Sequence, residues 1–61
     1  LSQREIEILR ELATGASNKA LAKKLFISEA TVKTHLIHIF QKLGVESRTA
    51  AVTAARERRL I

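Results

Sequence analysis

The sequence predicts an all-α domain of four short helices around one core. Serines placed to cap helix starts and glycines placed to end helices divide the chain at regular intervals. The apolar residues between them recur at helical spacing. No stretch sustains the alternation of apolar and polar residues that a half-buried strand shows, so we expect no sheet. The 61 residues suffice for one small domain, which we expect to span 1–61 and to be excised from a longer protein.

The first helix is expected to begin after Ser2. This serine stands three residues before Glu5, the spacing of a capping box. Gly15 is placed to end the helix, because glycine adopts the left-handed conformation without steric cost. The predicted apolar stripe comprises Ile6, Leu9, Leu12 and Ala13.

Two further helices joined by a tight turn form a predicted helix-turn-helix motif. Ser17 is placed to cap the shorter helix, and Ser28 to cap a longer helix over 29–43. The turn contains Phe26 and Ile27, two apolar residues that we expect to hold the helices together. The apolar positions of the shorter helix are Ala20, Leu21, Ala22 and Leu25.

A fourth helix is expected after Gly44, which is placed to end the helix over 29–43. Ser47 can cap this fourth helix. The residues predicted to point inward from it are Ala51, Val52, Ala55 and Leu60. The predicted fold is therefore a four-helix domain whose helix-turn-helix motif occupies the middle of the chain.

The formal net charge of +5 is unevenly distributed. Residues 18–44 hold five lysines and one glutamate, a net charge of +4, whereas residues 1–17 sum to −1 and residues 45–61 to +2. Positive charge concentrated around one motif indicates a polyanionic partner. The alternative interpretation is an ordinary solvated basic face.

The helix over 29–43 divides into two faces when its residues are placed at helical intervals. The predicted core side holds Val32, Leu36, Ile39 and Leu43, with Phe40 at its edge. The opposite side holds Ala30, Thr34, Ile37, His38 and Gln41, with Lys33 at the rim. A helix supported on one side, with small or hydrogen-bonding residues on the other, suits contact with the base edges of duplex DNA.

Three residues of this helix are candidates for base contacts. Lys33 can donate to guanine O6 and N7, and Thr34 can hydrogen-bond a base or touch a thymine methyl group. Ile37 can make an apolar contact with a thymine methyl group or a sugar. The alternatives are a solvated lysine at position 33 and a packing role for Ile37.

A second group of residues is expected to contact the DNA backbone, which fixes the register of the complex without direct sequence information. Amides at the start of a helix suit a phosphate oxygen, and lysine and arginine neutralise its charge. His35 is expected either to pack at the edge of the core or to donate to a phosphate. The candidates are Ser17, Asn18, Lys19, Thr31, His35, Lys42 and Arg48.

Catalytic and metal sites are disfavoured by the same residues. The serines and threonines stand mainly where helix caps are expected, and the chain has no glycine-rich phosphate loop. His35 and His38 have the spacing of a metal-binding pair, but no third ligand lies close in sequence, and there is no cysteine or aspartate. We expect neither enzymatic activity nor a cofactor, and the apolar runs are too short to cross a membrane.

Three blocks of the chain, LSQREIEILRELATGASNKALAKKL, ISEATVKTHLIHIFQKLGV and SRTAAVTAA, occur in an order and spacing that resemble a known family. The chain resembles the C-terminal DNA-binding domain of LuxR/FixJ/NarL-type transcription regulators. The resemblance implies that the third helix is the recognition helix and the fourth the dimerisation helix. It also implies base contacts at Lys33, Thr34 and Ile37 and backbone contacts around Ser17, Lys19 and Thr31.

The resemblance further implies a weak homodimer through the fourth helix, with Thr49, Thr53 and Arg56 on one face at i, i+4, i+7 spacing. We therefore expect the cytoplasmic output domain of a bacterial two-component response regulator, which binds an inverted-repeat operator in double-stranded DNA. RNA polymerase is a further candidate partner. The alternatives are the output domain of a quorum-sensing receptor, region 4 of a sigma factor, and a basic helical protein-interaction module without DNA specificity.

Overall fold

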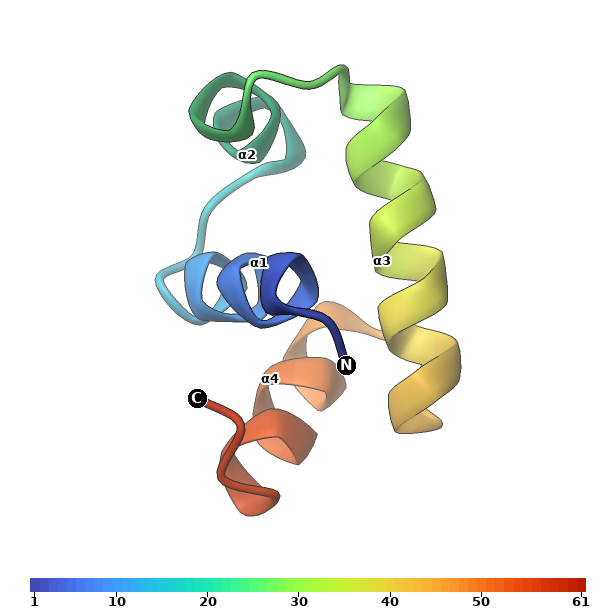
Figure 1. Ribbon diagram of the computed structural model, residues 1–61. Coiled ribbons are helices and arrows are strands. Elements are labelled where there is room, and N and C mark those ends of the chain that lie inside the picture. Colours follow the sequence, from blue (N-terminus) through green and yellow to red (C-terminus); the bar gives the residue numbers. More distant parts are fainter.

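The computed structural model describes all 61 residues, and its four helices without a strand confirm the predicted fold class. The helices are α1 (Gln3–Ala13), α2 (Asn18–Leu25), α3 (Glu29–Leu43) and α4 (Arg48–Glu57). In Figure 1, α3 stands upright along one side of the molecule, with α2 above α1 and α4 below it. α2 packs mainly on α3, and α1 on α4, while α3 also contacts α4. No helix has the length and hydropathy needed to pass through a bilayer.

A serine begins every helix, as predicted. In the capping box of α1, the Glu5 amide donates to Ser2 Oγ at 3.1 Å and the Ser2 amide donates to Glu5 Oε1 at 2.8 Å. Gly15 and Gly44 adopt the left-handed conformation after α1 and α3, with φ of 85° and 68°. The other three serine hydroxyls each accept a backbone N–H three residues further on at 3.1 Å; they are Ser17, Ser28 and Ser47.

Eleven buried apolar residues from all four helices form one core: Ile8, Leu9, Leu12, Leu21, Ala22, Val32, Leu36, Ile39, Leu43, Ala51 and Ala55. Only Ile8 was missing from the predicted set, although it is fully buried. The stripe assigned to α1 was too narrow, because the buried face of this helix also includes Glu5 and Ile8. Ala20 was wrongly placed inside; it is exposed, because α2 turns Leu21 and Ala22 toward the core.

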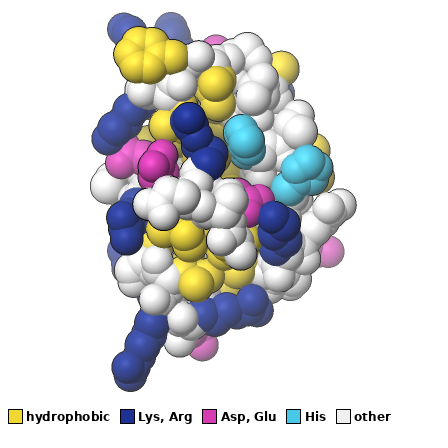
Figure 2. Space-filling view, in the orientation of Figure 1, with side chains coloured by type: hydrophobic (Ala, Val, Ile, Leu, Met, Phe, Trp, Pro, Cys, Tyr) yellow, Lys and Arg dark blue, Asp and Glu magenta, His cyan; other side chains and the backbone are white.

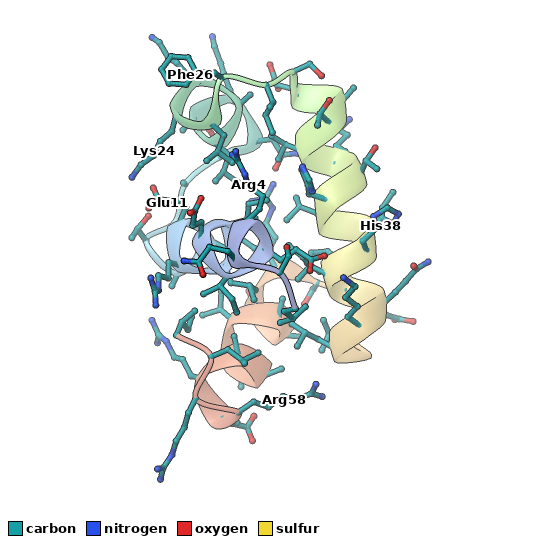
Figure 3. All side chains as sticks on the ribbon, viewed as in Figure 1. Arg4, Glu11, Lys24, Phe26, His38 and Arg58 are labelled. Carbon is teal, nitrogen blue, oxygen red and sulfur yellow. The ribbon has the colours of Figure 1, made fainter.

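The turn between α2 and α3 differs from the prediction at Phe26. Its side chain is 95% exposed and points away from the helices (Figure 3), so it does not hold them together. Phe26 has left-handed dihedral angles (φ 57°, ψ 43°) and its amide donates to Ala22 O, which turns the side chain outward. Only Ile27, which is half-buried against the core, performs the predicted packing.

Replacing Phe26 with glycine is expected to raise the free energy of unfolding by about 0.5–1 kcal/mol. A left-handed residue with a Cβ atom costs about 1–2 kcal/mol, and the greater chain entropy of unfolded glycine offsets only part of that gain. The matched control is Ala20→Gly, which places a glycine in the exposed right-handed helix α2 and should cost about 1 kcal/mol. Urea unfolding followed by circular dichroism measures both. Equal destabilisation by the two variants would contradict this assignment of strain.

Side-chain bonds between elements distant in sequence complete the fold. Arg58 Nη2 donates to Leu43 O at 3.0 Å and so ties α4 to the last turn of α3. On the face seen in Figure 2, acidic side chains lie beside basic ones. Two ion pairs join helices, Lys24–Glu11 and Lys42–Glu5, each with a shortest N–O distance of 2.8 Å.

Candidate DNA-binding surface

The two faces of α3 lie as predicted. Val32, Leu36, Ile39 and Leu43 are all buried. On the other side, Ala30, Thr34, Ile37, His38 and Gln41 are exposed. α2 and α4 both contact α3, so the core supports this helix from behind while its outer face is free.

Ile37 is 55% exposed, which excludes the alternative packing role. It is one of three exposed large apolar residues, and the only one on α3. Lys33 is also exposed, at the rim of the same face. The outer face of α3 therefore combines a cation with an apolar side chain, which suits guanine acceptors and thymine methyl groups respectively.

Thr34 already uses its hydroxyl hydrogen within the helix. Its Oγ1 donates to Ala30 O at 3.2 Å. A threonine hydroxyl has one hydrogen and two lone pairs, so in this rotamer Thr34 accepts hydrogen bonds from a base and offers its methyl group. Adenine N6 and cytosine N4 are the donors in the major groove, and the thymine methyl group is the apolar contact.

The candidate backbone contacts at the start of α2 lie around its first turn. Ser17 Oγ accepts the Ala20 amide, which leaves its hydroxyl hydrogen free to donate to a phosphate oxygen. Lys19 is exposed, whereas Asn18 is half-buried and its Oδ1 is enclosed without a hydrogen-bond partner. The Asn18 side chain can bind a phosphate only through its Nδ2 group, since a phosphate oxygen offers the buried Oδ1 no hydrogen.

One flank of α3 carries Thr31, His35, His38 and Lys42 at helical spacing. Thr31 is exposed, and its hydroxyl lies 2.9 Å from Ser28 Oγ. His35 is half-buried, whereas His38 is exposed on the helix surface (Figure 3). No group of three or more His, Cys, Asp or Glu side chains gathers in a geometry that would hold a metal ion.

Two of the predicted phosphate ligands have partners inside the domain. Arg48 is half-buried, and its Nη1 donates to Ala16 O at 3.3 Å. Lys42 Nζ donates to both carboxylate oxygens of Glu5, at 2.8 and 3.0 Å. The prediction overlooked these partners because Ala16 and Glu5 lie 32 and 37 residues away in sequence.

Glu5 is the one buried charged residue, with only 5% of its surface exposed. The hydrogen bond from Lys42, followed by that from the Ser2 amide, lowers the pKa of Glu5 from 4.5 to about 2. The signal in the sequence was the position of Glu5 on the buried stripe of α1, where an acid requires a partner.

The Glu5 pair is expected to make the domain acid-sensitive. Because the folded-state pKa is depressed, its contribution to stability is complete above pH 4.5 and decreases as the pH falls through about 2. We expect a contribution of about 1–3 kcal/mol, since the Lys42 side chain is 52% exposed and partly screened. Urea unfolding of the wild type and Glu5→Gln between pH 6 and 2 measures the effect. A pH dependence equally steep in Glu5→Gln would assign the loss to other groups.

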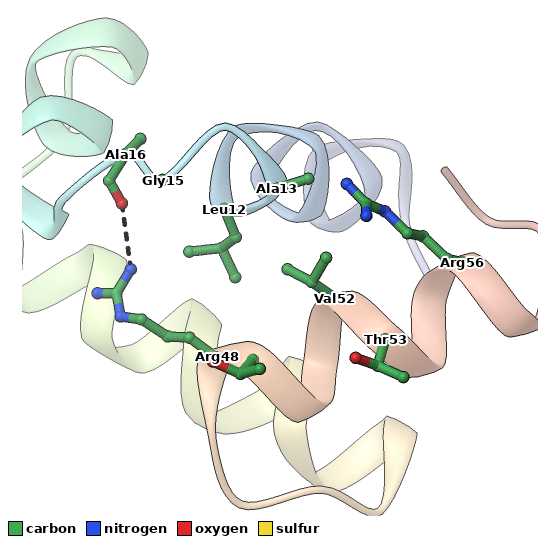
Figure 4. Close-up of a pocket in the computed structure, with 9 residues that line it drawn as sticks. Leu12, Ala13, Gly15, Ala16, Arg48, Val52, Thr53 and Arg56 are labelled. Carbon is green, nitrogen blue, oxygen red and sulfur yellow. Dashed lines mark hydrogen bonds between the residues drawn. The ribbon is translucent and has the colours of Figure 1, made fainter.

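The predicted pairing face of α4 borders a shallow hollow of about 420 Å³. Thr49, Thr53 and Arg56, all exposed, line it together with Leu12 and Val52 from beneath (Figure 4). Arg48 lies at the other end of this hollow, where its bond to Ala16 O is drawn as a dashed line. The structure therefore brings the three predicted pairing residues together on one surface, and no acidic side chain lines it.

The family model described as "Bacterial regulatory proteins, luxR family" matches residues 1–55. The chain belongs to this family. The match includes all of α1, α2 and α3 and most of α4, so it covers the outer face of α3 and two of the three predicted pairing residues, Thr49 and Thr53. The LuxR-family domain is a DNA-binding module of transcription regulators, which is not an enzyme class.

Relatives of this LuxR-family domain are transcription regulators. It is 54% identical over 57 residues to the CsgBAC operon transcriptional regulatory protein of Escherichia coli, covering 93% of the chain and 26% of that protein. It is 55% identical over 51 residues to a nitrate/nitrite response regulator protein homolog of Haemophilus influenzae, covering 84% and 24%. The solved structure of the response regulator ChrA from a heme-sensing two-component system has a TM-score of 0.98 and 72% identity, over 100% of the chain and 30% of ChrA.

The LuxR-family domain thus spans about a quarter of the length of the curated relatives it matches. These relatives support its assignment as a DNA-binding output domain of the response-regulator type. The three candidate base-contact residues, Lys33, Thr34 and Ile37, are all exposed in this domain. Of the predicted backbone contacts, Lys42 and Arg48 are bound to groups within the domain. Ser17, Lys19 and Thr31 are exposed, and Asn18 and His35 are half-buried.

Proposed function

We propose that this domain is the output domain of a two-component response regulator and binds an inverted-repeat operator through α3. The observation that carries the proposal is the division of α3 into a buried apolar side and an exposed side bearing Thr34 and Ile37, with Lys33 at its rim. Such a helix can lie in the major groove with its outer side chains against base edges.

We propose that Lys33, Thr34 and Ile37 contact the base edges. The proposed phosphate contacts are Ser17, Asn18, Lys19, Thr31 and His35, while Arg48 can contribute only the donors that it does not use on Ala16. The net charge of +4 over residues 18–44 supports a phosphate partner for this part of the chain.

We further propose that two domains pair weakly through α4 when bound to DNA, at Thr49, Thr53 and Arg56. These residues share one surface, but it is small and positively charged, so the isolated domain should remain largely monomeric. A symmetric pair places the two recognition helices on half-sites about one helical turn apart in an inverted repeat. The proposed setting is the bacterial cytoplasm, where the DNA-bound dimer is placed to contact RNA polymerase.

In-vitro selection of bound duplexes from a random library tests the proposal. We expect an enriched inverted-repeat motif and, for the dimer, a specificity ratio of about 10³ or more over random duplex in a mobility-shift titration. Equal affinity for enriched and random duplexes would favour a basic protein-interaction module. An enriched motif without two-fold symmetry would support sequence-specific DNA binding but contradict the proposed pairing through α4.

A further inference from the structure

The Lys42–Glu5 pair lies where the base-reading helix meets the start of α1. Lys42 is in the last turn of α3, on the same flank as the proposed phosphate contacts Thr31 and His35. This position alone would suggest that Lys42 also binds a phosphate. Its Nζ is instead bound to both oxygens of the Glu5 carboxylate.

Glu5 is held more firmly than the other acid that pairs between helices. Its carboxylate accepts the Ser2 amide as well as Lys42, and its own amide donates to Ser2 Oγ, so the capping box fixes its position. The Glu5 side chain is 7% exposed, whereas that of Glu11, which makes a single contact with Lys24, is 25% exposed. A phosphate that drew Lys42 away would leave Glu5 buried and charged without its cation, which is costly.

We propose that Glu5 is a positioning residue that limits sequence-independent affinity: it keeps Lys42 paired and so prevents this lysine from adding a phosphate contact to the DNA complex. The inference rests on the proposed binding of DNA through α3. Each phosphate that a protein neutralises strengthens its binding to every duplex and steepens the salt dependence. A phosphate contact carries no direct sequence information. The paired lysine therefore keeps affinity lower, and the salt dependence weaker, for every duplex alike.

The test compares the wild-type domain with variants at Glu5 and Lys42. For each protein it measures the affinity for a random-sequence duplex and for a selected duplex at salt concentrations of about 50 to 300 mM. Glu5→Gln removes the acid but retains the capping box, because glutamine also serves at this position. The slope of log affinity against log salt is expected to steepen by about 0.9 per domain, which raises affinity for random duplex roughly tenfold at 50 mM salt. Affinity for the selected duplex should rise by the same factor and the specificity ratio should stay unchanged, because a phosphate contact acts equally on every sequence.

Lys42→Gln separates the inference from the simpler expectation that Lys42 binds a phosphate. With Lys42 already paired to Glu5, its removal should leave the slope unchanged, whereas loss of a phosphate contact would reduce it by about 0.9. The double variant E5Q/K42Q should return to the wild-type slope. Lys42→Gln carries the test if Glu5→Gln fails to fold in a thermal unfolding experiment.

Glu11→Gln is the matched control. It raises the net charge by the same one unit and releases Lys24, which lies at the end of α2 away from the exposed side of α3 (Figure 3). Its slope should equal that of the wild type. A wild-type slope for Glu5→Gln, a reduced slope for Lys42→Gln, or steepening by Glu11→Gln equal to that by Glu5→Gln would each overturn the inference. A wild-type domain without salt-dependent duplex binding would instead reject the proposed function.

Discussion

Replacing Ile39 with alanine is expected to lower the free energy of unfolding by about 2–5 kcal/mol, because the change leaves a cavity in the core. Ile39 is fully buried on α3, among eleven core residues drawn from all four helices. Domains of this size rarely have more than about 3–5 kcal/mol of stability in total. The variant should therefore be largely unfolded at 37 °C, as measured by circular dichroism and urea titration.

Ile37→Ala is the control for this prediction. It is the same substitution two residues earlier on the same helix, but Ile37 is 55% exposed. Its effect on stability should lie within about 0.5 kcal/mol, while its affinity for the selected duplex should fall. A loss of stability comparable to that of Ile39→Ala would show that α3 is turned differently from the orientation described above.

Replacing Lys33 with alanine is expected to weaken binding to the selected operator by about 1–3 kcal/mol and to relax the preference at one base pair. Lys33 is exposed at the rim of the outer face of α3 and has no intramolecular ion pair, so its ammonium group is free to donate to guanine O6 and N7. Fluorescence anisotropy against a set of single-base operator variants measures both effects.

Lys19→Ala provides the comparison, because its proposed partner is a phosphate. That variant should weaken all duplexes alike and reduce the salt slope by about one unit. If Lys33→Ala also lowered affinity evenly across the operator variants, the assignment of Lys33 to a base would be wrong. The two lysines are both exposed, so differences in burial should not obscure the comparison.

The surface proposed to read bases followed from local rules. Side-chain direction along a helix repeats at a fixed angle, so the burial of Val32 and Leu36 is linked to the exposure of Thr34 and Ile37 without reference to the rest of the fold. The four helix starts were equally local, because a serine cap and the amide it accepts lie three residues apart.

The errors arose at positions where more than one element meets. Ile8 is buried because α1 presents a wider face to the core than a single stripe, and Phe26 is exposed because the turn requires left-handed backbone there. The spacing of apolar residues reports neither the number of neighbours of a helix nor the dihedral angles of a turn residue. For this reason the sequence around Phe26 suggested, wrongly, that this apolar side chain points into the core.

Amino-acid order was sufficient for the all-α class, the helix starts and the direction in which α3 faces, because each depends on interactions within about four residues. It did not give the end of α4, which stops at Glu57, before Leu60. The pairing of Lys42 with Glu5 and the bond from Arg48 to Ala16 depend on groups 37 and 32 residues apart. Such contacts form only when the helices have packed. The folded chain thereby determines which of its cations are free for phosphate and which are held by the domain itself.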